Sequence, residues 1–180
     1  NRDNLGFVKA VNQGAALASA EHVLLLNNDT RLERGAIEYA NETLESGEDI
    51  GAVGGKILLL DGSLQEAGSL IWRDGSCLGY GRGEDPEQPE YMFRRDVDYC
   101  SGAFLLFRKQ DFTALNGFDE EFAPAYYEES DFCVRLRKSG KRVVYDPRAI
   151  ITHFEFASTG GITNASELQL APSPAVLSEA

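Results

Sequence analysis

The stretch VLLLNNDT, residues 23–30, runs four apolar residues directly into Asn27, Asn28, Asp29 and Thr30. A short apolar run of this kind is typical of a strand buried in a sheet. In an open α/β sheet, ligands bind beyond the carboxyl ends of the strands, where these polar residues would lie. Asn, Asp and Thr are also common turn residues, and from these residues alone a turn is the favoured interpretation.

The next residues predict a helix. Thr30-Arg31-Leu32-Glu33 fits a capping box, which predicts a helix over about 31–46. The N-terminus of a helix attracts anions, so a carboxylate at Asp29 is favourable beside it. If Asp29 also held Mg²⁺ or Mn²⁺, the cation could bridge to a diphosphate.

The rest of the chain alternates between predicted helices and strands, and a charged loop over 79–96 interrupts the alternation. Together with a hairpin turn at Asp61-Gly62, this order indicates an α/β fold with mixed strand order. Helices are expected at 4–19, 111–116 and 128–140, and strands at 50–60, 64–72, 97–108, 142–147 and 149–154.

The ends of the chain suggest its domain organisation. No strand precedes the helix at 4–19, so we expect the first βαβ units of the fold to be missing. Residues 159–180 are low in aromatics and rich in Pro and Ser, which predicts a tail or linker. The expected division is one partial domain over 1–158 and a tail over 159–180.

Composition limits the class of function. The 180 residues carry a net charge of -12, which argues against nucleic acid as the main partner because phosphate backbones require clustered Lys and Arg. The apolar runs are too short to cross a bilayer. Three scattered cysteines, Cys77, Cys100 and Cys133, form no CxxC motif and indicate a reducing compartment.

A second candidate site is YYEESD, residues 126–131, which places Glu128, Glu129 and Asp131 at a helix start. A solvated first turn would explain these acids, because the helix dipole favours them there. Aromatic neighbours can instead raise the pKa of a carboxyl group and make it a useful base. The helical spacing predicts that Arg135 pairs with an acid on its own face, while Glu129 points about 100° away from Glu128.

His153 is a third candidate because it ends the apolar run AIITH. A lone histidine is more often structural than a ligand. At the end of a strand, in a fold with one candidate carboxylate, a metal-binding role becomes plausible.

Taken in order, these stretches resemble family 2 glycosyltransferases with the GT-A fold. The resemblance rests on NLGFVKAVNQGAALA, VLLLNNDT, the segment from SGAFLLF to VVYDP, and ITHFEFAS, and it covers about 1–158. The block GFDEEFAPAYYEESDFCVRLR is similar to the bacterial rhamnosyltransferase-like branch that makes O-antigen or cell-surface polysaccharide. The implied fold is a mixed α/β sheet flanked by helices, here without the first βαβ nucleotide-binding half.

The resemblance implies a metal and donor site. The family's DxD motif falls on Asn27-Asn28-Asp29, so Asp29 would hold a divalent Mg or Mn ion on the diphosphate of a nucleotide-sugar donor. His153 would complete the metal site. Asn27 replaces the first Asp of the motif and offers only an amide oxygen, so the metal would depend more on the diphosphate. Ser101 and Gly102 would let the backbone approach the donor sugar or the acceptor.

The resemblance also implies a reaction. The family's ED pair falls on Glu128-Glu129, with Glu129 as the base that takes a proton from an acceptor hydroxyl, and Asp131 lies in the same motif. The sugar would be transferred with inversion to a saccharide or lipid-linked acceptor, in cell-surface polysaccharide synthesis. The expected location is the cytoplasm, with peripheral association at the inner face of the membrane.

Three alternatives remain at the level of sequence. Asn27 and the missing front half favour a sugar- or nucleotide-binding fragment without catalysis. A metal-dependent hydrolase would need more carboxylates or histidines than this chain gathers. A purely structural domain is the last alternative, and the agreement of several motifs in order argues against it.

Overall fold

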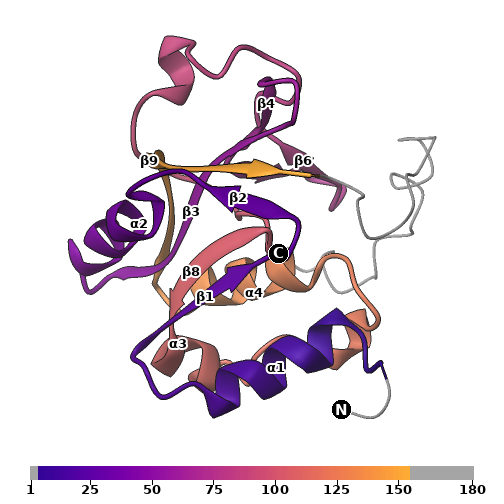
Figure 1. Ribbon diagram of the computed structural model, residues 1–180. Helices are drawn as coiled ribbons and strands as arrows, with labels where there is room; N and C mark the ends of the chain where they lie inside the picture. The colour runs from indigo at the N-terminus through magenta and orange to yellow at the C-terminus, as the bar shows by residue number, and fades with distance from the viewer. Residues whose placement is uncertain (1–3, 155–180) are drawn as a thin grey trace.

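The computed structural model of the protein describes residues 4–154, which form a mixed seven-stranded sheet, a two-stranded sheet and the helices that pack on them (Figure 1). The strands are β1 (His22–Leu26), β2 (Thr30–Leu32), β3 (Ile50–Leu58), β4 (Leu64–Ala67), β5 (Ser69–Ile71), β6 (Cys77–Gly79), β7 (Arg95–Asp96), β8 (Phe104–Arg108) and β9 (Arg142–His153). The α-helices are α1 (Phe7–Leu17), α2 (Ala36–Glu45), α3 (Lys109–Ala114) and α4 (Glu128–Lys138), and the 3₁₀ helices are η1 (Pro89–Tyr91) and η2 (Glu120–Phe122).

The main sheet has the strand order β1-β8-β3-β9-β2, with β4 also paired to β3 and β7 to β9. β3 and β9 run parallel, and the other pairs are antiparallel. Strands β5 and β6 form the separate antiparallel hairpin. This arrangement confirms the prediction of an α/β fold with mixed strand order.

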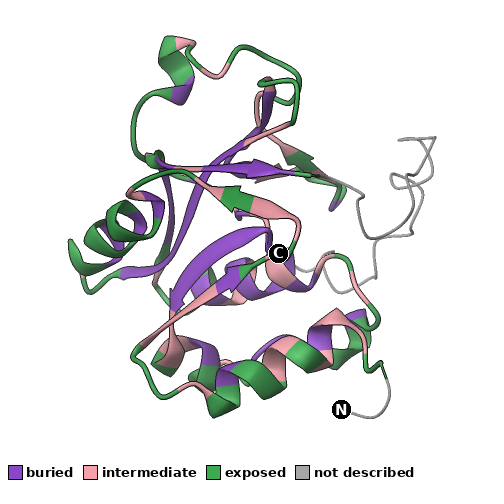
Figure 2. Cartoon of the chain, in the orientation of Figure 1, coloured by how far each residue is buried: buried purple, intermediate pink, exposed green. Residues whose placement is uncertain are grey.

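The two faces of the sheet have separate apolar cores because neighbouring side chains of a strand point to opposite faces. Leu105 and Phe107 of β8 belong to the core that includes residues of α1, α3 and α4, whereas Leu106 belongs to the core that includes α2. Figure 2 shows the central strands buried between these helices. Four aromatic rings stack or meet edge to face in the first core, namely Phe107, Phe112, Phe118 and Phe132.

The predicted helix over 31–46 is wrong at its start. Thr30–Leu32 is a strand, and α2 begins only at Ala36, after Gly35 in the left-handed region with a φ of 86°. The Thr30 hydroxyl donates to the carbonyl of Asn27 at 2.7 Å and caps no helix. Pairing of Thr30 with His153 on β9 gives the backbone a sheet partner, and this tertiary contact overrides the local capping pattern.

Further elements also differ from prediction. The strand expected at 64–72 is divided into β4 and β5, which belong to different sheets, and the strand expected at 97–108 forms β8 only over Phe104–Arg108. The strands expected at 142–147 and 149–154 are one continuous strand, β9, whose register against β3 shifts between Gly55 and Lys56. That irregularity absorbs the Asp-Pro-Arg segment which suggested a break. Helix α3 begins at Lys109, two residues before the predicted start.

The loop predicted over 79–96 is tied to the domain at its centre. Tyr91 is buried, and its hydroxyl donates to Glu84 at 2.6 Å. The hydroxyl of Tyr145 donates to the carbonyl of Tyr91 at 2.8 Å, and the buried Lys56 ammonium donates to the carbonyl of Pro86 at 2.7 Å. These anchors hold the centre of the loop against the rest of the domain.

No helix within residues 4–154 is long and apolar enough to cross a membrane. The predicted tail, 159–180, and the last residues of the predicted domain lie outside the described residues.

Candidate active site

The three predicted metal-binding residues come together at one edge of the sheet. Asn27 and Asp29 follow β1, while His153 ends β9 and pairs in register with Thr30. The Nε2 atom of His153 lies 3.2 Å from Oδ1 of Asp29 and 3.5 Å from Nδ2 of Asn27. Asn28 is exposed and takes no part in the hydrogen bonds that join the other three side chains within residues 4–154.

The histidine ring is oriented by a residue that the sequence did not single out. Nδ1 of His153 donates to Oε1 of Gln65 at 2.9 Å, and both side chains are buried. Nε2 then carries a lone pair and faces the carboxylate of Asp29. In the neutral ring, the lone pair of Nε2 and the carboxylate of Asp29 can be joined by a proton or by a metal ion, so the cluster fits a divalent metal bound by Asp29 and His153.

The donor set is small. Among residues 4–154, no three His, Cys, Asp or Glu side chains gather as a metal site. The protein would therefore supply one carboxylate, one imidazole and the amide of Asn27, whose oxygen can reach the ion after a rotation of the amide group. Hard cations such as Mg²⁺ and Mn²⁺ take six oxygen or nitrogen ligands, which leaves positions for a diphosphate.

Main-chain hydrogen bonds hold the turn that carries Asp29. The amide of Phe154 donates to the carbonyl of Asp29 at 2.7 Å. The amide of Asn27 donates to the carbonyl of Ala103 at 3.2 Å, so the turn is joined to the segment just after Ser101 and Gly102.

The predicted base lies at the start of α4. Glu128 and Glu129 follow Tyr126 and Tyr127, which adopt positive φ angles of 83° and 73°, a costly conformation for bulky residues. Glu128 is buried, and Oε2 of each glutamate has no hydrogen-bond partner within the described residues. Strain and unpaired buried oxygens together are typical of functional sites rather than of solvated helix ends.

Burial raises the pKa values of both glutamates. The pKa of Glu128 rises to about 8 because its carboxyl group is buried and because Glu129 adds a nearby negative charge. The pKa of Glu129 also rises through burial, and hydrogen bonding from backbone amides, including that of Gly102, partly offsets the rise. Because the two carboxyl groups are close and buried, the pair resists carrying two negative charges near neutral pH.

A buried glutamate that the sequence analysis missed lies beside this pair. Oε1 of Glu66 accepts from the amide of Ser101, and Oε2 accepts from the hydroxyl of Ser69, each at 3.0 Å. Burial raises the pKa of Glu66 to about 7, and the charge of Glu129 adds to the increase. Glu66 and Glu129 thus hold consecutive amides, those of Ser101 and Gly102, so both predicted backbone residues lie at the site.

Asp131 occupies a different environment. Its Oδ2 accepts from Nε of Arg135 at 2.7 Å, which confirms the predicted pairing of Arg135 with an acid on its own helix face. Arg135 also donates to the carbonyls of Leu115 and Gly117. The structure therefore shows Asp131 within a connection between α4 and the segment after α3.

A sequence signal for the missed residues exists in β4. Leu64–Ala67 is buried along its whole length, although its two central residues, Gln65 and Glu66, are polar. Polar side chains buried on both faces of a strand need specific partners, and here these are His153 and Ser101. The sequence shows two polar residues between apolar ones in this segment. It does not show that both are buried, because burial on both faces depends on tertiary packing.

The fold and the site define the class of protein. A mixed α/β sheet flanked by helices is the architecture of GT-A glycosyltransferases. The chain belongs to the family described as glycosyltransferase like family 2, which matches residues 1–169.

Relatives in sequence support this assignment. The N-acetylglucosaminyl-diphospho-decaprenol L-rhamnosyltransferase of Mycobacterium tuberculosis is 31% identical over 180 residues, covering 87% of this chain and 58% of the relative. The rhamnosyltransferase WbbL of Escherichia coli is 36% identical over 77 residues, covering 43% of this chain and 28% of the relative. The O-antigen biosynthesis protein RfbC of Myxococcus xanthus is 31% identical, covering 83% and 12%. The chain thus spans less than two thirds of the length of these relatives.

Solved structures confirm the fold. GalNAc-T7 with UDP, GalNAc and Mn²⁺ superposes with a TM-score of 0.69 at 12% identity, covering 86% of this chain and 31% of that chain. The mannosyltransferase PcManGT from Pyrobaculum calidifontis, in complex with GDP-Man and Mn²⁺, gives 0.54 at 15% identity, covering 82% and 36%. At these identities, the likeness establishes the GT-A fold.

Proposed function

We propose that this chain carries the metal-binding and base-bearing part of an inverting glycosyltransferase. The enzyme would move a sugar from a nucleotide-diphosphate donor to a hydroxyl of a saccharide or lipid-linked acceptor, in cell-surface polysaccharide synthesis. The observation that carries the proposal is that residues 101–103 contact both the Asp29–His153 cluster and the Glu128–Glu129 pair. We call these two groups the half-sites. Ala103 accepts from Asn27 beside the Asp29–His153 cluster, and Gly102 adjoins Glu129.

The chemistry follows from the charge states of the carboxyl groups. A base must be ionised to accept a proton, and a raised pKa increases its proton affinity. Glu128 and Glu66 have pKa values of about 8 and 7, so the neutral form of Glu128 predominates at neutral pH and Glu66 is partly protonated. We assign the base to Glu129 because backbone amides of its own residue and of Gly102 donate to its carboxylate and favour its charged form, while burial raises its pKa.

The proposed step is a single displacement. Glu129 takes the proton of the acceptor hydroxyl while the acceptor oxygen forms a bond to the anomeric carbon. The bond from that carbon to the diphosphate breaks, and the nucleoside diphosphate leaves with the electron pair from the opposite face. A divalent ion held by Asp29, His153 and Asn27 would neutralise charge on the diphosphate.

The donor class and the ion are supported by the relatives. The solved neighbours contain Mn²⁺ with UDP or GDP-Man, and a sequence relative is named for transfer to a diphospho-decaprenol acceptor. A lipid-linked acceptor would place the enzyme at the inner face of the membrane as a peripheral protein. The cytoplasmic location remains part of this proposal.

The test measures sugar transfer from a panel of UDP-, dTDP- and GDP-sugars with Mn²⁺. The two readouts are the release of nucleoside diphosphate and the anomeric configuration of the product. Glu129→Gln should lose transfer by at least 10²-fold while donor binding, measured by calorimetry, is kept. Normal transfer by this variant would refute the base assignment. Donor binding without transfer by the unaltered protein would favour a non-catalytic binding module.

A further inference from the structure

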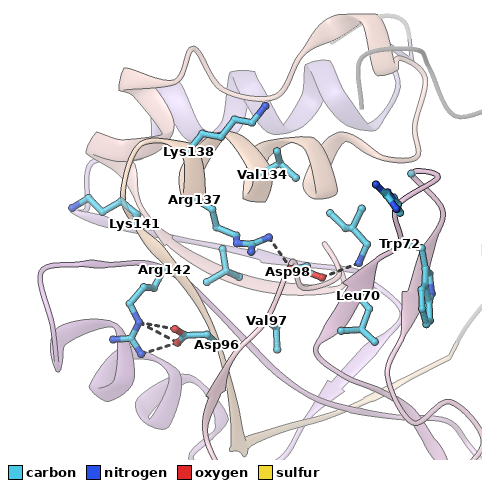
Figure 3. Close-up of a pocket in the computed structure, with 14 residues that line it drawn as sticks. Leu70, Trp72, Asp96, Val97, Asp98, Val134, Arg137, Lys138, Lys141 and Arg142 are labelled. Carbon is cyan, nitrogen blue, oxygen red and sulfur yellow. Dashed lines mark hydrogen bonds and ion pairs between the residues drawn. The ribbon is translucent and has the colours of Figure 1, made fainter. Parts of the chain in front are cut away.

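A second concave surface lies outside the candidate active site, between α4 and the β5–β6 hairpin (Figure 3). Its volume is about 720 Å³. We call it the basic cleft because five cationic residues line it, namely Arg73, Arg137, Lys138, Lys141 and Arg142.

The basic cleft differs in charge from the rest of the protein. Its five cations face only two lining carboxylates, Asp96 and Asp98, in a chain with a net charge of -12. Both carboxylates are engaged, because Arg137 pairs with Asp98 at 2.8 Å and Arg142 with Asp96 at 2.7 Å (Figure 3). The paired arginines therefore contribute to the shape of the cleft more than to its net charge.

Two cations of the cleft remain available. Arg73, in the turn of the hairpin, and Lys138, in the last turn of α4, are exposed, and neither has a hydrogen bond or ion pair within residues 4–154. Lys141 instead reaches Asp111, outside the cleft, at 3.7 Å. Positive charges without a partner in a strongly acidic protein attract an anion selectively to this surface.

An aromatic surface accompanies these charges. Trp72 lines the cleft with its side chain 56% exposed, and it is the single tryptophan of the sequence. Figure 3 shows it on the hairpin opposite α4. The exposed indole ring offers a large apolar area for contact with a ligand.

We propose that the basic cleft binds a phosphate-bearing ligand, with the phosphate held by Arg73 and Lys138 beside the ring of Trp72. Arginine offers a fork of N–H donors that matches phosphate oxygens, and lysine adds a compact charge. Arg137 follows Glu129 by two turns of α4, about 12 Å along the helix. The cleft would therefore suit the phosphate of a lipid-linked acceptor. The identity of the ligand as an acceptor rests on the proposed function, whereas the binding of phosphate to the cleft is independent of that function.

The experiment uses Trp72 as a reporter. Pyrophosphate is titrated into the protein in EDTA at constant ionic strength, and the fluorescence of the single tryptophan is recorded. We expect a saturable change, and a Kd at least tenfold higher in Arg73→Gln/Lys138→Gln. The control Lys9→Gln/Arg34→Gln removes the same charge from the half-exposed Lys9 and the exposed Arg34, both outside the cleft, and should stay within twofold. A response that is absent, or equal in all three proteins, would overturn the proposal.

Two further arms identify the source of the phosphate and separate this proposal from the proposed function. Co-sedimentation with phosphatidylglycerol vesicles, compared with phosphatidylcholine vesicles, tests a lipid headgroup, and a soluble glycosyl diphosphate tests an acceptor. In either case, the affinity of the protein for the vesicles or for the glycosyl diphosphate must be lower in the Arg73→Gln/Lys138→Gln variant than in the unaltered protein. Asp29→Asn should leave the Trp72 response to pyrophosphate unchanged even if it abolishes transfer. Loss of the response in Asp29→Asn would instead place the phosphate at the metal site and refute the cleft.

Discussion

At the scale of single residues, the site depends on side chains that position others. Gln65 contacts no substrate in the proposed reaction, yet it fixes which nitrogen of His153 faces Asp29. Outer residues of this kind are often as important to metal affinity as the ligands themselves.

We therefore predict that Gln65→Leu weakens binding of Mn²⁺ in the presence of a nucleoside diphosphate by about 10- to 100-fold. Without the acceptor at Nδ1, His153 can rotate or place its proton on Nε2. The measurement is the free Mn²⁺ signal in electron paramagnetic resonance. Gln110→Leu, at an exposed position, is the matched control. Equal affinity in both variants would show that Gln65 does not orient the histidine.

A second prediction at this scale concerns Glu66. Its pKa is raised from 4.5 to about 7, so the neutral form is favoured in the folded protein. The stability that this provides is fully present below pH 4.5 and is lost as pH rises through 7, by about 3 kcal/mol in total.

Glu66→Gln should therefore reduce the fall in unfolding free energy between pH 5 and pH 8 by up to about 3 kcal/mol. Gln keeps an oxygen that can accept from the amide of Ser101. Urea unfolding at both pH values measures the effect, and Glu38→Gln, on the exposed side of α2, controls for the loss of a carboxylate. An unchanged pH dependence would mean that Glu66 is ionised without cost in the folded protein.

At the scale of elements, the pairing of β3 with β9 supports the site because β9 delivers His153. Gly55 lies at the register shift of this pair, and a Cβ atom there would collide with the carbonyl oxygen of Ala149. Gly14 in α1 has open space around its missing Cβ. The two glycines therefore respond in opposite ways to the same change.

We predict that Gly55→Ala destabilises the protein by about 3 kcal/mol, because a backbone atom must move. Gly14→Ala should stabilise it by about 1 kcal/mol, because alanine favours the helix interior. Chemical denaturation of both variants measures the difference. A stable Gly55→Ala protein would show that the β3–β9 irregularity adapts to a side chain.

Elements also show what could be predicted from the sequence. The hairpin at Asp61-Gly62 and helix α4, which ends before Gly140, follow from local turn and cap chemistry, and both are confirmed. The capping-box pattern predicts Thr30 as the cap of a helix, whereas its pairing with His153 on the distant strand β9 decides its conformation. Gln65 and Glu66 escaped notice for the same reason, because their partners are distant in sequence.

At the scale of the whole molecule, the proposed metal cluster joins the turn after β1, strand β4 and the end of β9, which are distant in the described chain. Ligand binding there should stabilise the entire fold, by RT ln(1 + [L]/Kd). With a single carboxylate in the donor set, a bound ion would need oxygen ligands from the diphosphate.

We thus predict that Mn²⁺ and a nucleoside diphosphate together, at about 100 times their Kd, raise the unfolding free energy by about 2.7 kcal/mol, while either alone has a much smaller effect. Denaturant unfolding with each ligand and with both gives the comparison. Asp29→Asn should abolish the joint effect. Stabilisation by Mn²⁺ alone of the same size would show that the protein completes the coordination shell without the nucleotide.

The segment 101–103 joins the two half-sites through main-chain groups: the amides of Ser101 and Gly102 serve Glu66 and Glu129, and the carbonyl of Ala103 serves Asn27. Such a connection does not depend on which side chains the segment carries, but it does depend on the number of residues in the segment. Alanine scanning would pass over it, while the insertion of one residue would put the wrong amide opposite each carboxylate. Replacing one amide by an ester is the change that would expose its contribution.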